Sequence, residues 1–166
     1  MLAPDAVDQL RTWLEESQHE VVVECVRTPA GVGWGRMLSK AGAGCSPAQV
    51  TTAPWCMHTH PRACYARNGT YYGWPSGADY ATFLDQKGTE HLVCALEGIY
   101  VIRSTPDARR RWARLSEDEK DALERQWDVP SDHPERTPSQ VLASLASRLD
   151  GWVDVTLHPY SKSKKL

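Results

Sequence analysis

The sequence predicts a mixed α+β domain in which helices pack on a central sheet. Four segments, at 5–16, 76–86, 116–127 and 137–151, have helical signals, and each opens on a residue typical of a helix N-cap. Segments rich in β-branched or alternating apolar residues separate them and predict strands at 20–26, 32–38, 50–60, 90–96, 99–103 and 152–157.

The first half of the chain predicts one helix followed by three strands. Apolar residues recur at helical spacing in 5–16, and Val21-Val22-Val23 favours a buried strand. A turn at 28–31 leads to the next strand, and small residues predict a loop at 41–47. The third strand should end at Pro61. Residues 62–75 are polar and aromatic without a clear period, which predicts a loop.

The second half predicts three capped helices and three strands. Ser76 and Asp79 have the spacing of an acidic capping box, and Gly88 follows that helix. Glu97-Gly98 predicts the turn of a hairpin between 90–96 and 99–103. Ser116 and Thr137 open the next two helices, with a Pro-rich loop at 128–138 between them. The last strand precedes a basic tail at 161–166.

The composition favours one domain over 1–160, with the motifs in 5–103 and further helices and a strand in 104–160. The 166 residues carry a net charge of −2, which does not favour nucleic acid as a partner. No apolar run reaches the roughly 18–20 residues of a membrane-spanning helix, and the first residues lack a secretory signal. We therefore expect an intracellular, cytoplasmic protein with no membrane partner. Five cysteines, an odd number, favour reduced thiols.

The stretches His58-Thr59-His60-Pro61 and Ser76-x-x-Asp79 predict a metal site. Residues i and i+2 of a strand project from the same face, so both imidazoles can reach one cation. Asp79 falls in the first turn of the following helix, from which its carboxylate can turn toward the strand end. Two histidines and one carboxylate leave one position open on a tetrahedral zinc, as in catalytic sites. Zinc lowers the pKa of a bound water to roughly 7.

These residues resemble the JAMM (MPN-plus) motif of zinc-dependent isopeptidases, which also needs a glutamate at the junction of the first helix and first strand. Glu20 occupies that place. The resemblance covers residues 5–103 and implies a curved, mostly antiparallel sheet flanked by helices, related to the cytidine-deaminase fold. It implies a metalloprotease that hydrolyses isopeptide or peptide bonds of ubiquitin or a ubiquitin-like modifier by a zinc-activated water, with the conjugate as its partner.

The resemblance also implies a role for each matching residue. His58, His60 and Asp79 would hold Zn²⁺. Glu20 would take a proton from the water and return it to the leaving amine. Ser76 would donate a hydrogen bond to the oxyanion of the tetrahedral intermediate.

The chain departs from the family in the spacing between the two halves of the motif. The distance from His60 to Asp79 is 79 − 60 = 19 positions, longer than usual, and the extra residues fall within 62–73. We expect this insertion at the mouth of the site. The longer form is similar to JAMM-like proteins of large DNA viruses, which implies a viral protein or virion component.

Other interpretations of these residues stay open. Glu24 shares a strand face with Glu20 and is the alternative proton acceptor. Cys56 and Cys64, together with the two histidines, offer the ligands of a structural zinc site. A chain that keeps the fold without catalysis would be an MPN-type scaffold or a virion-associated structural protein. The basic cluster at 109–114 is interpreted as a solvated face, without nucleic-acid contact.

Overall fold

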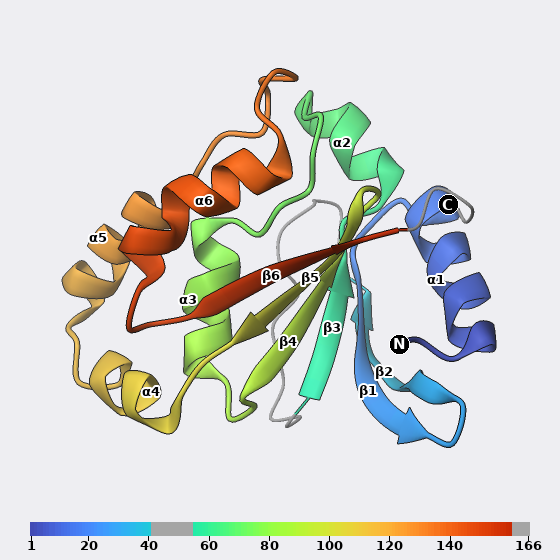
Figure 1. Cartoon of the computed structure of the whole chain (residues 1–166), viewed down its shortest axis with the longest axis horizontal. Helices are drawn as coiled ribbons and strands as arrows, with labels where there is room; N and C mark the ends of the chain where they lie inside the picture. Colours follow the sequence, from blue (N-terminus) through green and yellow to red (C-terminus); the bar gives the residue numbers. More distant parts are fainter. Residues whose placement is uncertain (41–54, 161–166) are drawn as a thin grey trace.

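The computed structural model describes residues 1–40 and 55–160 (Figure 1). Its helices are α1 (Pro4–Glu16), α2 (Arg62–Asn68), α3 (Gly77–Asp85), α4 (Pro106–Trp112), α5 (Glu117–Trp127) and α6 (Pro138–Leu149). Its strands are β1 (Val21–Thr28), β2 (Gly31–Lys40), β3 (Trp55–Thr59), β4 (Glu90–Cys94), β5 (Gly98–Arg103) and β6 (Asp154–Pro159). These ranges confirm the predicted α+β class.

The six strands form one sheet in the order β2-β1-β3-β4-β5-β6. Only β3 and β4 pair in parallel, and all other neighbours are antiparallel. The chain between β3 and β4 contains α2 and α3. Parallel neighbours need such a long crossover connection. The prediction of a mostly antiparallel sheet flanked by helices is therefore confirmed.

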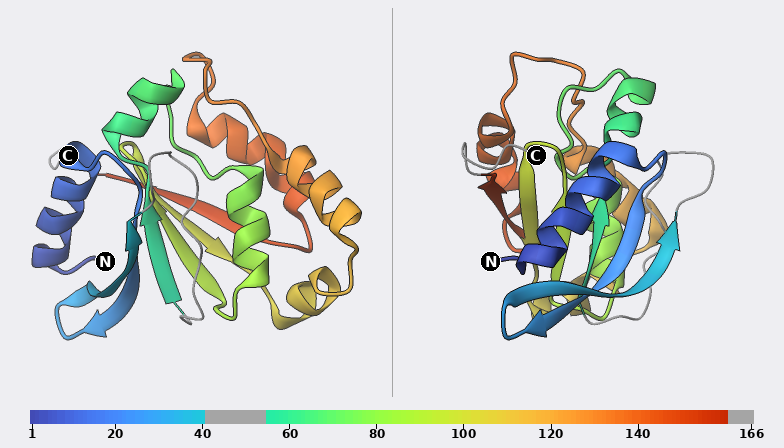
Figure 2. Two further views of the ribbon diagram at one scale, coloured as in Figure 1. Left: turned by 180° about the vertical axis from the view of Figure 1, so that it is seen from behind. Right: turned by 90° about the vertical axis from the view of Figure 1, so that its right-hand side faces the viewer.

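Helices cover both faces of this sheet (Figure 2). α1 packs on one face, against a core that includes Met57, Leu92 and Val101. The helices α3, α5 and α6 pack on the other face, against a core that includes Val93 and Ile102. Leu92 and Val93 face opposite cores because side chains alternate along a strand.

The strand β3 lies at the centre of the sheet, and the backbone that follows its last residue is still hydrogen-bonded to β4. Within β3, His58 pairs with Val22 of β1 and Val93 of β4. After its end, the His60 amide donates to the Cys94 carbonyl at 2.8 Å. The sheet therefore holds both histidine backbones in place.

The structure corrects the prediction for 62–75, because α2 occupies the first half of the expected loop. The helix has only two buried residues, Cys64 and Tyr65, too few for an amphipathic period. Tertiary contacts stabilise it: Arg62 forms a bidentate pair with Glu15 of α1, and the Tyr65 hydroxyl donates to Glu97 at 3.0 Å. The helix α4 was also not predicted. The predictions for 41–47, 50–54 and 161–166 lie outside the described residues.

The four cysteines within 1–40 and 55–160 divide into two kinds. Cys25, Cys56 and Cys94 are buried free thiols, as predicted. Cys64 is disulfide-bonded, so the prediction of reduced thiols is wrong for this residue.

The basic cluster is only partly a solvated face. Arg109 is half-buried and donates to the carbonyls of Phe83 and Gln86 at the end of α3. Arg111 donates to the Gly151 carbonyl and lies over the Trp152 ring. Arg110, Arg111 and Arg114 are exposed, as the interpretation of a solvated face predicts, and Arg109 departs from it because its guanidinium satisfies carbonyl groups that the end of α3 leaves open. No helix within 1–40 and 55–160 is long and apolar enough to cross a membrane.

Candidate metal centre

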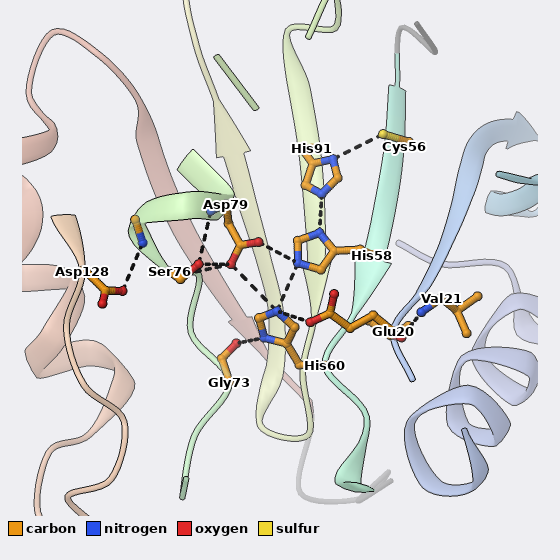
Figure 3. A network of polar contacts seen from close by, with 12 residues as sticks. Glu20, Val21, Cys56, His58, His60, Gly73, Ser76, Asp79, His91 and Asp128 are labelled. Carbon is orange, nitrogen blue, oxygen red and sulfur yellow. Dashed lines mark hydrogen bonds and ion pairs between the residues drawn. The ribbon is translucent and has the colours of Figure 1, made fainter. Parts of the chain in front are cut away.

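His58 and His60 point toward one another from the end of β3 (Figure 3). Their Nε2 atoms lie 3.1 Å apart. His58 is buried, with 4% of its surface exposed, and His60 is half-buried. The predicted convergence of both imidazoles on one face of the strand is confirmed in the arrangement of these atoms.

Asp79 reaches the two histidines from the first turn of α3. Its Oδ1 lies 3.2 Å from His58 Nε2, and its Oδ2 lies 3.9 Å from His60 Nε2. Ser76 is the N-cap of this helix, and the two residues form a complete capping box. The backbone amide and hydroxyl of Ser76 both donate to Asp79 Oδ2, at 2.8 and 2.9 Å. The capping box thus fixes one carboxylate oxygen and leaves Oδ1 directed at His58.

The carboxyl group of Glu20 lies beside this cluster, directly before the first residue of β1. Its Oε1 is 3.7 Å from His60 Nε2, and the residue is 3% exposed. Burial raises the pKa of Glu20 to about 8, with a smaller contribution from the charge of Asp79 and an opposing one from His58. In the absence of a cation, Glu20 therefore keeps its proton near neutral pH.

Glu24, the alternative to Glu20, points elsewhere. Its carboxylate forms an ion pair with Arg36 at 3.0 Å, across the β1–β2 ladder. In the described part of the chain, only Glu20 of the two contacts the histidine cluster. The geometry therefore favours the position at the junction of helix and strand.

Opposing effects set the charges of the cluster. Burial alone would raise the pKa of Asp79, but the neighbouring His58 and His60 and the Ser76 amide lower it well below its usual range. Burial alone would lower the pKa of His58, but the negative charge of Asp79 outweighs this effect. The pKa of His58 is therefore raised. Burial and the charge of His58 lower the pKa of His60. The site therefore holds an ionised Asp79 beside imidazoles of unequal basicity.

Each histidine is oriented through its second ring nitrogen. His60 Nδ1 lies 2.8 Å from the Gly73 carbonyl, which can only accept, so this nitrogen carries a proton. His58 Nδ1 lies 2.7 Å from Nε2 of His91, a buried residue of β4. Sequence reasoning missed both partners. The signal for His91 was a single imidazole inside the apolar strand 90–94, a position where a histidine needs a hydrogen-bond partner.

The arrangement fits a tetrahedral metal ion. His58, His60 and Asp79 form the one group of three or more His, Cys, Asp or Glu ligands found within 1–40 and 55–160, with ligand atoms within 4.8 Å of one another. Two nitrogen ligands of one zinc lie about 3.3 Å apart at the usual bond lengths, close to the observed 3.1 Å. Asp79 Oδ1 and Glu20 Oε2 are buried without a hydrogen-bond partner among the described residues. A cation would satisfy the first, and a water at an open position the second.

The alternative of a structural zinc site is not supported by this geometry. Cys64 is disulfide-bonded and offers no thiolate. The Cys56 sulfur faces away from the cluster, toward His91 Nδ1 at 3.3 Å. Burial raises the pKa of Cys56 to about 11, which keeps the thiol protonated.

The insertion forms one wall of a cavity at this cluster. The cavity has a volume of about 160 Å³, and Glu20, His60 and Asp79 line it. Neutral side chains make up most of the remaining lining, among them Tyr65, Asn68, Thr70, Tyr72, Trp74 and Ser131. The last of these comes from the loop before α6, which pairs with the insertion through the Tyr71 amide and the Ser131 carbonyl at 2.8 Å. The C-terminal part of the chain thus completes the site.

Comparison with known proteins gives one partial similarity. The chain is 33% identical over 67 residues to the uncharacterized protein 3R of Frog virus 3 (isolate Goorha). The match covers 40% of this chain and 15% of the viral protein. No protein family and no solved structure matches the chain. The viral protein's name states no activity, so it assigns none to this chain.

Proposed function

We propose that this chain is a JAMM-type zinc metallopeptidase with a cytidine-deaminase-like fold. The observation that carries the proposal is the meeting of His58, His60 and Asp79 beside the buried carboxyl of Glu20. The order of elements adds support, because the glutamate precedes β1, the histidines end β3 and the aspartate opens α3. Two imidazoles and one carboxylate are a ligand set that zinc accepts with one position left open.

The residues around this site divide the chemistry of amide hydrolysis among them. Zinc, when bound, supplies a Lewis acid and lowers the pKa of water to about 7. Glu20 accepts the proton of the water that attacks the carbonyl carbon. It then returns this proton to the amine as the C–N bond breaks.

Ser76 is the donor for the oxyanion in this proposal. Ser76 lines the same cavity as Glu20 and His60. The hydroxyl has one proton, which it donates to Asp79 Oδ2 in the absence of substrate. Rotation about the Cβ–Oγ bond of Ser76 would redirect that proton toward a developing oxyanion.

The proposed substrate is an isopeptide or peptide bond that follows the C-terminal tail of ubiquitin or a ubiquitin-like modifier. This part of the proposal rests on the family resemblance. A short peptide or a sulfur-carrier fusion is the other substrate of this class to examine.

A panel of ubiquitin chains and modifier conjugates tests the proposal. The zinc-loaded protein should cleave at least one conjugate, and a chelator should abolish cleavage. If a zinc-loaded sample cleaves none of the conjugates or peptides, the non-catalytic scaffold becomes the better explanation of the fold.

A further inference from the structure

Three buried side chains, His91, Cys56 and Gln86, line up behind His58. Figure 3 shows the first two on the side of His58 away from the proposed metal. His58 Nδ1 lies 2.7 Å from His91 Nε2, and His91 Nδ1 lies 3.3 Å from the Cys56 sulfur. The Cys56 thiol continues to Gln86 Oε1 at 3.8 Å. His91 and Cys56 are each 1% exposed. Their backbones are register partners across the parallel β3–β4 ladder.

The hydrogen-bond inventory of these groups allows one arrangement when a metal is bound. His58 Nε2 faces His60 Nε2 and Asp79, so this nitrogen must present its lone pair to the metal. A neutral imidazole has a single N–H, which must then sit on His58 Nδ1. His91 Nε2 has to accept this proton, and His91 therefore carries its own proton on Nδ1.

The other hydrogen bonds of the line have the same donor-to-acceptor direction. The proton on His91 Nδ1 points at the Cys56 sulfur, which accepts it. The Cys56 S–H then points at Gln86 Oε1, an amide oxygen that can only accept. Each donor in the line thus has one acceptor, and no ring nitrogen is left without a partner.

We propose that His91 is a positioning residue that fixes the tautomer and the ring orientation of His58, with Cys56 and Gln86 completing the line. The proposal rests on the metal site of the proposed function. Outer partners that orient a ligating histidine are worth about 10–100-fold in metal affinity when they are removed. The other histidine needs no such line, because the Gly73 carbonyl orients His60 directly.

A packing role alone does not account for an imidazole at this position. A buried polar group costs free energy unless it is hydrogen-bonded. The neighbouring Leu92 and Val93 show that the strand takes aliphatic residues toward both cores. The apolar neighbour of His91 on α3 is the Phe83 ring, with the ring centroids 6.2 Å apart, and this contact does not require an imidazole.

The test compares His91→Phe with His91→Gln. The first removes the acceptor and keeps a ring, whereas the second offers an amide oxygen that can accept from His58 Nδ1. Zinc affinity by chelator competition should fall about 10–100-fold in His91→Phe and by less in His91→Gln. Leu92→Ala is the matched control, because it weakens the same strand from its opposite face. It should lower thermal stability and leave zinc affinity unchanged.

NMR of the cobalt-substituted protein gives a second readout that packing would not change. The wild type should show two exchangeable imidazole N–H signals, one from each ligand histidine. His91→Phe should lose the signal of His58 or expose it to rapid exchange, and the signal of His60 serves as the internal reference. His91→Phe with wild-type affinity and both signals would overturn the proposal.

Two further outcomes separate this inference from the proposed function. A wild type that binds zinc and cleaves nothing refutes the peptidase, while the affinity ratio of the variants still decides the role of His91. A wild type that binds no zinc refutes both. If His91→Phe does not fold, Cys56→Val replaces it, since valine cannot accept from His91. Cys56→Val should then bind zinc more weakly than Cys56→Ser, which keeps an acceptor, and equal affinities would overturn the proposal.

Discussion

Glu20 Oε1 faces Nε2 of His60 at a distance of 3.7 Å, close enough for one water to contact both groups. Glu20 directly precedes β1 and His60 directly follows β3, and these two strands are neighbours in the sheet. The Val21 amide donates to the Thr59 hydroxyl at 3.0 Å, and this bond ties the two strand ends together. The distance between the proposed proton carrier and the proposed ligand is therefore set by the sheet.

Removal of a ligand should abolish tight zinc binding. We expect His58→Ala and Asp79→Ala to weaken zinc by more than about 100-fold, because a ligand contributes more than an outer partner. Metal analysis after dialysis measures this effect. His133→Ala is the control, since that histidine is exposed and pairs with Asp132 and Glu135, away from the cluster. Full zinc content in both ligand variants would show that the site is wrongly assigned.

The metal-free protein should lose stability as the pH rises. The pKa of Glu20 is raised to about 8 in the folded state, from 4.5. Between these values the folded state keeps a proton that the unfolded state has released, so the free energy of unfolding falls with rising pH. Glu20→Gln removes this loss and should be more stable than the wild type at pH 9, by a few kcal/mol at most. Denaturant unfolding in the presence of a chelator measures the difference.

Below pH 4.5 the two proteins should have nearly the same stability, since Glu20 is then protonated in both states. A difference between them that does not change from pH 4 to pH 9 would show that burial of Glu20 does not alter its titration.

The sequence was sufficient to predict most of the site because its geometry is local. Two-residue alternation places His58 and His60 on one face, and a capping box sets Asp79 in the first turn of α3. Both rules act within a few residues. The position of Glu20 also follows from its own neighbours, at the boundary between a helix and an apolar run.

The missed features depend on contacts between distant segments. α2 has seven residues and is stabilised by Glu15 and Glu97, which are 47 and 32 positions away from their partners in the helix. His91 meets His58 because β3 and β4 pair in parallel. The register between these two strands cannot be predicted from a single sequence. The contacts of Arg109 and Arg111 could not be predicted because their acceptors are backbone carbonyls, which carry no signal in the sequence.

Ser76→Ala should impair both folding and turnover. The loss of an N-cap hydroxyl costs about 1 kcal/mol, and the loss of an oxyanion donor costs about 10²–10³-fold in rate. Ser116→Ala is a matched control because Ser116 forms the same kind of capping box with Glu119 at the start of α5. Both variants should lower the melting temperature, and only Ser76→Ala should slow cleavage. Equal cleavage rates in the two variants would show that Ser76 acts as a helix cap and not as an oxyanion donor.

Glu20→Gln should leave zinc bound and slow hydrolysis about 10²–10⁴-fold, the usual contribution of a general acid–base group. The change keeps the shape of the side chain and removes its ability to carry a proton. Glu24→Gln is the control, because Glu24 pairs with Arg36 on the neighbouring strand, and its rate should be close to that of the wild type. Zinc content and single-turnover cleavage of one conjugate separate binding from chemistry. A slow Glu24→Gln beside an active Glu20→Gln would reverse the assignment, and full activity in both would place the proton carrier on another residue.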